Sequence, residues 1–462
     1  MKVLRAPTLA TLLALGAACT VHAQGFQLNE IGSCAVARGQ AVTASPCKDP
    51  SVIYWNPAAA ASLDGWSIYA GAAAIQVGGG FTADTSRRFS SGDVPISVPF
   101  HVFVNYGSRD NRWAAGLGVY VPYGLTSQWH SDFPGRFEAL KASLASVYFQ
   151  PNFAYRFAPG WQVGGGPVIG YSQVQLRQSL DLAQQFAEPG LTFGQLGVAA
   201  QTEFARAKLS GSGTAVGFNI GVHGTLGADW EVGARYLSKL DFHYDNADAT
   251  FSQVLTNLVL PAGNPLGAPA GTPVDAILSS QFAPGQPLSA QKVSTRITHP
   301  AQFQVGLGYS GLVTTRLEGD FEWTQFSSFD NLPITFSGPA SSQSRTLIED
   351  YQNSWSIRVG AEHSFPVGIK GRLGFTYVKS PAPDETVTPL LPDMNRRNYT
   401  VGLGVPLSPR YTLDAGYLHV DTSGRRGRIV ERTSAAQTAL DLNSGFYTLD
   451  ANVLSLSIRA NF

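Results

Sequence analysis

The pattern of apolar and polar residues predicts β-strands along most of the chain, and the C-terminal segment shows this pattern most clearly. One face of the last nine residues carries Leu454, Leu456, Ile458, Ala460 and Phe462. The opposite face carries Ser455, Ser457, Arg459 and Asn461. A period of two residues is that of a strand with one apolar and one polar face. The chain therefore ends in a predicted amphipathic strand that closes on an aromatic residue.

Similar alternation recurs from Trp66 onward and predicts fourteen strands. The segments are 66–78, 99–107, 112–122, 144–157, 161–179, 213–226, 230–246, 294–309, 313–327, 350–365, 369–379, 396–405, 410–420 and 447–462. Alternation alone would also fit a soluble sandwich. Short turns, however, alternate with long loops at 79–98, 180–212, 247–293 and 421–446. This layout is typical of outer-membrane barrels, so the predicted fold is all-β: a 14-stranded antiparallel transmembrane β-barrel over 66–462.

The first 23 residues have the layout of a cleaved secretory signal peptide. Lys2 and Arg5 precede a short apolar stretch, and Ala23 ends a small-x-small cleavage site. A lipoprotein signal with Cys19 is an alternative, although the upstream leucine stands one place too far from the cysteine. No run of 18 apolar residues follows, so transmembrane helices are not expected. We therefore predict export to the bacterial outer membrane.

The composition agrees with an exported barrel and argues against several other functions. Charged residues make up 14% of the chain, and the formal net charge is +0. A neutral chain is a poor candidate for nucleic-acid binding. No nucleophile elbow or HExxH pair occurs, and the glycine-rich run at 164–170 lacks the Lys-Ser/Thr ending of a phosphate-binding loop. We therefore expect no enzyme activity, no metal and no cofactor.

Residues 24–65 precede the predicted strands and lack strong alternation. They are too few for an independent domain, so they form either a periplasmic tail or a plug inside the barrel. Cys34 and Cys47 lie in this segment, and in an exported protein such a pair predicts a disulfide. Two buried free thiols are the alternative. A bridge would stiffen a small plug.

Several short motifs follow one another in a characteristic order. They are Gly-Phe-Gln-Leu-Asn-Glu at 25–30, Ala-Arg-Gly at 37–39, Tyr-Trp-Asn-Pro-Ala at 54–58, Val-Tyr-Val-Pro-Tyr-Gly-Leu at 119–125, the segment 320–329 with its Trp-Thr pair, and Ser-Pro-Ala-Pro-Asp-Glu-Thr at 380–386. Together they resemble FadL-type proteins, outer-membrane transporters of long-chain fatty acids and aromatic hydrocarbons. The resemblance implies a fourteen-stranded barrel with an N-terminal hatch, here 24–65, inside the lumen. It also makes Asn56, Pro57 and Ala58 the hatch motif, although the same residues would form an ordinary turn. The cysteine pair departs from the family pattern.

The resemblance implies passive transport of hydrophobic molecules, captured at the extracellular loops and released past the hatch. Long-chain fatty acids are the first interpretation and monoaromatic hydrocarbons the alternative. An open porin or a surface adhesin is less consistent with the hatch and the apolar loops. The expected capture residues are Phe186, Leu191, Phe193, Leu255, Leu258 and Leu260. Exposed apolar surface usually marks a binding site, but these residues would also pack on one another to close the barrel top.

A carboxylate headgroup would require a cation, and Arg177, Arg206 and Lys208 flank one capture loop. Lipopolysaccharide phosphates or lumen carboxylates are alternative partners for these cations. Lumen charges such as Glu318 and Asp320 are expected to form a structural ladder between neighbouring strands. We expect a monomer that contacts outer-membrane lipid and lipopolysaccharide.

The exit of the family is thought to be lateral, through a kink in the third strand. That strand contains Gly116, Gly118 and Pro122, residues that weaken packing or remove a ladder hydrogen bond. We expect a bulky residue at position 118 to slow uptake without disturbing folding.

Overall fold

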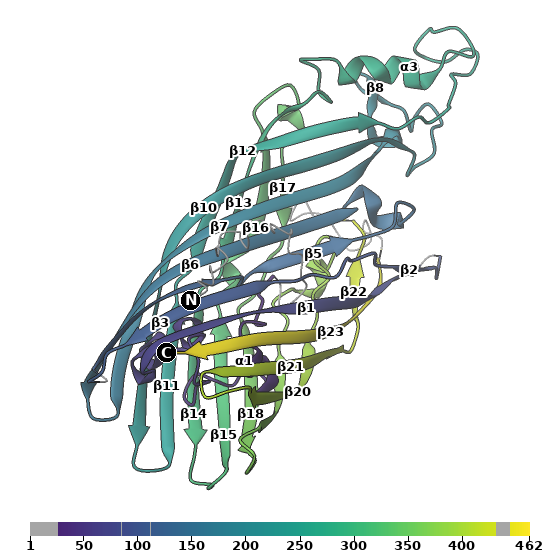
Figure 1. Ribbon diagram of the computed structural model, residues 1–462. Coiled ribbons are helices and arrows are strands. Elements are labelled where there is room, and N and C mark those ends of the chain that lie inside the picture. Colours follow the sequence, from purple (N-terminus) through teal and green to yellow (C-terminus); the bar gives the residue numbers. More distant parts are fainter. Residues whose placement is uncertain (1–25, 85, 111, 431–443) are drawn as a thin grey trace, which may run out of the picture.

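The computed structural model describes residues 26–84, 86–110, 112–430 and 444–462, which form a closed antiparallel barrel around an N-terminal segment (Figure 1). Closure comes from β1 (Gly65–Ala83), which pairs with β23 (Ser444–Asn461) from Ser67↔Asn461 to Ala83↔Gly445. The predicted fourteen-stranded barrel is therefore confirmed. The predicted signal peptide, residues 1–23, lies outside the described residues.

Several barrel strands consist of two consecutive pieces, so the structure has more strand labels than barrel positions. After β1, the barrel strands are β3 (Phe100–Gly107), β4 (Trp113–Tyr120) with β5 (Gly124–Gln128), β6 (Lys141–Ala158), β7 (Trp161–Asp181), β10 (Glu203–Leu226), β11 (Trp230–Leu237) with β12 (Leu240–Gln253), β13 (Gln291–His299) with β14 (Gln302–Tyr309), β15 (Thr315–Thr324) with β16 (Asn331–Phe336), β17 (Arg345–Ile348) with β18 (Ser354–Ser364), β19 (Lys370–Val378), β20 (Arg396–Pro406), β21 (Tyr411–Thr422) and β23. Four short strands lie beside them: β2 (Phe89–Ser91), β8 (Phe186–Glu188), β9 (Leu191–Thr192) and β22 (Arg425–Arg428).

The helices are short and lie in the N-terminal segment and the connections. They are α1 (Ser33–Ala37), α2 (Val52–Trp55), α3 (Val274–Ser279) and the 3-10 turns η1 (Pro57–Ser62), η2 (Pro134–Phe137), η3 (Leu182–Gln184), η4 (Ser280–Phe282), η5 (Phe326–Ser328), η6 (Ser341–Gln343) and η7 (Asp384–Thr386). In the described part of the chain, no helix has the length and apolar character needed to cross a membrane.

The outer wall carries an apolar belt with aromatic residues at its edges. On β23, Leu454 and Leu456 are half exposed on the outside, whereas Ser455 and Ser457 are buried inside, as the alternation predicted. Aromatic rings on neighbouring strands touch near one edge, with 5.1 Å between the Trp66 and Tyr106 centroids. Near the other edge, the Trp355 and Tyr377 centroids are 5.6 Å apart. Such a belt with aromatic borders is the lipid-facing surface of an outer-membrane barrel.

Two predicted loops are shorter than expected, because their strands continue beyond the apolar belt. β7 and β10 pair as far as Asp181 and Glu203, so the loop predicted at 180–212 covers only 182–202. Similarly, β12 and β13 reduce the loop predicted at 247–293 to 254–290. The outward residues of these extensions are polar, so their alternation lacks the apolar face by which strands were recognised.

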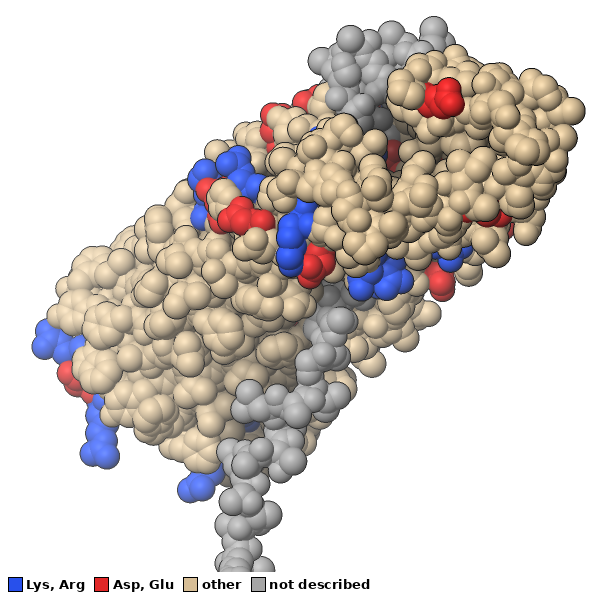
Figure 2. Space-filling model, turned by 90° about the horizontal axis from the view of Figure 1, so that it is seen from above, with Lys and Arg blue, Asp and Glu red and all other residues tan. Residues whose placement is uncertain are grey.

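These two loops pack together into a cap with its own apolar core, made of Leu182, Phe193, Phe204, Ala205, Leu260, Val274, Leu278 and Leu288. Figure 2 shows few charged side chains over this end of the molecule, the one that carries α3 in Figure 1. The long connections lie at this end, which identifies it as the extracellular end.

Residues 26–64, here called the hatch, fill the lumen at the level of the belt (Figure 1). Helix α1 packs on β19, β20, β21 and β23, whereas η1 packs on β4, β6, β7 and β10. The hatch therefore touches opposite parts of the wall. Its backbone polar groups find partners among the inward polar side chains: the Ser33 amide donates to the Ser457 hydroxyl at 3.3 Å, and the Gly39 carbonyl accepts from the Thr376 hydroxyl at 2.6 Å.

Candidate functional site

The Asn-Pro-Ala motif turns the hatch and fastens it to the wall. The Asn56 side chain accepts a bond from the Ala58 amide (3.3 Å) and donates to the carbonyl of Val222 on β10 (3.0 Å). Pro57 begins η1, where a missing N–H has no cost. A Cβ on Gly164 of β7 would lie 2.6 Å from the Pro57 carbonyl oxygen. Only glycine allows this approach, so the motif is a docking point as well as a turn.

Two carboxylates of β15 bind the hatch directly, which corrects the prediction that they serve only a ladder between strands. Asp320 Oδ2 accepts bonds from the amides of Val42 and Thr43, each at 3.0 Å, and from Thr43 Oγ1 at 2.7 Å. Glu318 accepts from the Ala44 amide (2.6 Å) and pairs with Arg38 (2.9 Å). These bonds join β15 of the barrel wall to the middle of the hatch.

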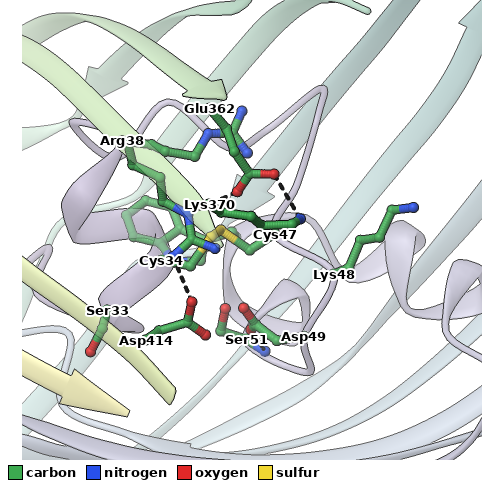
Figure 3. The surroundings of a disulfide bond; sticks show 12 residues. Ser33, Cys34, Arg38, Cys47, Lys48, Asp49, Ser51, Glu362, Lys370 and Asp414 are labelled. Atoms are coloured by element: carbon green, nitrogen blue, oxygen red, sulfur yellow. Dashed lines mark hydrogen bonds and ion pairs between the residues drawn. A yellow bond between two sulfur atoms is a disulfide. The ribbon is translucent and has the colours of Figure 1, made fainter. Parts of the chain in front are cut away.

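A disulfide joins Cys34 to Cys47 near the end opposite the cap (Figure 3). It borders a void of about 110 Å³, lined also by Asp49 and Asp414. Burial, together with the nearby Asp414 carboxylate, raises the pKa of Asp49 to about 6. Wall residues beyond the disulfide form their own network, in which Arg372 bonds both Asp414 and Glu362. The disulfide therefore stiffens the hatch where it meets the charged inner rim.

On the extracellular side of the hatch lies an almost wholly apolar cavity of about 90 Å³. Phe26 closes it on the hatch side, and the Phe26 ring touches Phe329 with centroids 5.2 Å apart. The larger apolar side chains around it are Leu125, Leu144, Val174, Leu176, Leu209, Val293, Ile297, Leu332, Ile334, Leu390 and Leu391. Such a lining suits a hydrocarbon better than a polar solute.

A vestibule of about 730 Å³ lies between this cavity and the cap. Leu176, Leu209 and Ile334 line both spaces, so the two adjoin. Among the described residues that line the vestibule, one is an arginine, Arg345 on β17, whose guanidinium donates to the Gln178 side chain at 2.8 Å. Arg345 stands directly opposite Ile334 in the pairing of β16 and β17, and therefore lies at the junction of vestibule and cavity.

The third barrel strand is broken between β4 and β5, at the predicted Pro122. β3 pairs with β4 but not with β5 in the described structure. The free edge of β5 is bonded instead to the hatch: Leu28 donates to the Pro122 carbonyl, and Gly124 donates to the Phe26 carbonyl, both at 2.8 Å. The residue that closes the apolar cavity therefore also fills a gap in the barrel wall.

Gly116 and Gly118 lie on β4 below this break, under helix α2 of the hatch. A Cβ at Gly118 would lie 2.7 Å from the Phe103 ring and 3.2 Å from Ile53. A bulky residue at 118 would therefore have to displace the Phe103 ring and Ile53 of the hatch, and the expectation that folding stays intact remains a prediction.

The predicted headgroup cations do not line the cavity or the vestibule. Arg177 lies on β7, and Arg206 and Lys208 lie on β10 rather than in a loop. All three point outward, on the same face as Tyr171 and Val216. Sequence reasoning instead missed Arg345, because 328–349 shows no strong alternation and the predicted strands stop at 327 and resume at 350.

The predicted capture residues divide into two groups. Phe193 and Leu260 are buried in the cap core, and Leu258 packs against it. Phe186 and Leu255 are 63% and 68% exposed, and Leu191 is partly exposed. Only Phe186, Leu255 and Leu191 are available to an incoming solute. Phe193, Leu260 and Leu258 instead pack on one another to close the top of the barrel.

One family of proteins matches residues 14–462 of the chain, and its description reads "Outer membrane protein transport protein (OMPP1/FadL/TodX)". The chain belongs to this family. A putative outer membrane protein of Neisseria meningitidis is 25% identical over 476 residues, covering 98% of each chain. A long-chain fatty acid transport protein of Escherichia coli is 22% identical, covering 89% of this chain and 90% of the relative.

Solved structures of the FadL family share the fold. A Pseudomonas aeruginosa FadL homologue has a TM-score of 0.75 at 20% identity, covering 95% of this chain and 100% of the other. The Pseudomonas putida toluene transporter TodX has a TM-score of 0.67 at 15% identity, with the same coverage. Family membership makes this an outer-membrane protein that transports hydrophobic compounds, and the family consists of transport channels rather than enzymes.

Proposed function

We propose that this protein is a passive transporter of long-chain fatty acids, which enter at the cap and pass through the vestibule into the apolar cavity. The observation that carries this proposal is the position of Arg345 at the junction of the two spaces. A fatty acid has a carboxylate and an apolar tail, and the site offers a guanidinium beside an apolar cavity. Guanidinium and carboxylate form charge-assisted, frequently bidentate bonds. The E. coli relative named above supports the same substrate class.

Exit is proposed to be lateral, through the gap that the hatch fills beside β5. Phe26 and Leu28 make the two hatch bonds to this edge, and Phe26 also closes the cavity. Withdrawal of this short segment would join the cavity to the outside of the barrel without opening a channel along its axis. The hatch motif at 56–58 and the carboxylates of β15 hold the remaining hatch in place meanwhile. The transporter acts as a monomer, and the substrate moves down its concentration gradient.

Uptake of a monoaromatic hydrocarbon is the second candidate, because the cavity is almost wholly apolar and bordered by the Phe26 and Phe329 rings. Toluene carries no charge and would make no use of Arg345. The toluene transporter TodX, which shares the fold, supports this candidate. Arg345 therefore separates the two functions.

The test is uptake of labelled oleate and of toluene by cells that lack their own fatty-acid porin and express this protein or its variants. Loss of one charge-assisted bond is worth about 1.5–3 kcal/mol, so Arg345→Gln should reduce oleate uptake about 10- to 100-fold. Arg345→Lys should restore part of it, and toluene uptake should not change. Arg206→Gln, on the outer face, is the matched control and should behave as the wild type.

Oleate uptake that survives Arg345→Gln would contradict the headgroup role. Toluene uptake without oleate uptake would assign the protein to the aromatic substrates. A folded barrel that takes up neither oleate nor toluene would contradict both functions.

A further inference from the structure

Three cations stand side by side on the outer wall, on three adjacent strands. In the strand register, Lys141 of β6 is opposite Arg177 of β7, which is opposite Lys208 of β10. Neighbouring strands are about 4.8 Å apart, so the three backbone positions span about 10 Å. Among the described residues, none of the three side chains takes part in a hydrogen bond or an ion pair. Like charges directly opposite one another are destabilising unless an anion lies between them.

This cation row stands above the apolar belt on the extracellular side. On β7 the outward residues change from Ile169 and Tyr171, which belong to the belt, to Gln173 and Gln175 before Arg177. Arg177 follows the belt edge at Tyr171 by six residues. Six residues are about 20 Å along a strand, or about 14 Å along the membrane normal at a tilt of about 45°. Phospholipid headgroups occupy only about 5–8 Å on each side of the hydrocarbon, so the row stands above that level.

Between the row and the belt lies a polar groove of about 840 Å³ on the outer face. Hydroxyl and amide side chains are prominent in its lining, including Ser143, Gln173, Gln175, Ser210, Ser212 and Thr214, and Lys141 lies at its edge. Its acidic residues, Asp245 and Asp248, are on β12, the strand farthest from Lys141, and Asp248 pairs with Lys292 at 2.7 Å. Hydroxyls and amides suit the hydroxyl groups of a sugar, and an unpaired cation row suits phosphate.

We propose that Lys141, Arg177 and Lys208, together with this groove, form a binding site for the phosphorylated saccharide of lipopolysaccharide. The outer leaflet around the barrel presents phosphates carried on sugars above the acyl chains, which matches the height of the row and the polar groove below it. A phospholipid phosphate would lie nearer the belt and would leave the groove empty. The site anchors the extended wall of β6, β7 and β10, which supports the cap and the vestibule. The proposed binding of lipopolysaccharide does not depend on whether the transported compound is a fatty acid or an aromatic hydrocarbon.

The experiment is native mass spectrometry of the full-length mature protein titrated with deep-rough lipopolysaccharide, its dephosphorylated form and phosphatidylglycerol. The triple variant Lys141→Gln/Arg177→Gln/Lys208→Gln should bind deep-rough lipopolysaccharide at least about tenfold more weakly than the wild type. The control Arg109→Gln/Arg112→Gln/Arg410→Gln removes the same charge from exposed residues at the opposite end of the barrel. It should bind within about twofold of the wild type.

The variant Lys141→Arg/Arg177→Lys/Lys208→Arg preserves the charge row and should keep most of the binding, which separates loss of charge from loss of structure. Dephosphorylated lipopolysaccharide should bind the wild-type protein as weakly as intact lipopolysaccharide binds the triple variant. Equal binding by wild type and triple variant would overturn the proposal. Phosphatidylglycerol that competes as well as lipopolysaccharide would overturn it too, because the site would then be a general anion site.

Discussion

The contact between Asp320 and the hatch gives the sharpest test of what keeps the lumen closed. Asp320 is buried, and its Oδ2 accepts three bonds from Val42 and Thr43. Asp320→Asn keeps the shape but removes the charge. A hydrogen bond to a charged group contributes about 1.5–3 kcal/mol and a neutral one about 0.5–1.5, so each bond loses about 1 kcal/mol. The hatch should therefore be held about 3 kcal/mol less tightly, which raises the population of released hatch about 100-fold.

Single-channel conductance in planar bilayers measures this population directly. The wild type should be closed almost all the time, and the open fraction of Asp320→Asn should be about 100-fold larger. Glu362→Gln is the matched control, because Glu362 is also a lumen carboxylate but, among the described residues, bonds only the wall residues Lys370 and Arg372, each at 2.8 Å. It should stay closed. A closed Asp320→Asn channel would refute the anchoring role, and equal opening of both variants would show that the wall, not the hatch, had been disturbed.

Three further predictions test other parts of the structure. Phe193→Ala should destabilise the cap by about 3–5 kcal/mol and speed proteolysis of 182–202, because Phe193 is buried in the cap core. Phe186→Ala should only slow uptake, because Phe186 is exposed. Equal protease sensitivity of the two variants would contradict the assignment of Phe193 to packing and Phe186 to capture. Cys34→Ser/Cys47→Ser should weaken hatch attachment by about 3 kcal/mol, so the channel should open at a lower temperature than in the wild type. An unchanged opening temperature would exclude a stabilising role for the disulfide. Glu30 borders a small internal void, and desolvation raises its pKa from 4.5 to about 7. Between pH 4.5 and about 7, the folded protein therefore holds a proton that the unfolded chain has released. The stability of the wild type should fall as the pH rises through this range, whereas that of Glu30→Gln should not. Melting curves at pH 5 and pH 8 would show the difference. Parallel curves for the two proteins would contradict this assignment.

Residues 454–462 illustrate what local sequence determines. Their inward and outward faces follow from the two-residue period, which the backbone geometry of a strand imposes whatever its neighbours are. The strand positions and the barrel class therefore followed from the sequence alone, and the ordered motifs suggested the family. Where the outward face turned polar, as on β10 and β12 above the belt, the same logic made the predicted strands too short.

Only the tertiary structure decided which groups meet across the barrel. Asp320 and Thr43 are 277 residues apart, and their contact depends on closure of the barrel around the hatch and on the register of every strand between them. The same holds for Arg345 at the mouth of the apolar cavity, because its place there depends on the strands and loops packed around it. A one-residue change of register turns a side chain from lumen to lipid. Local alternation thus determined the elements of this protein, and the long-range register of the closed barrel decided its site.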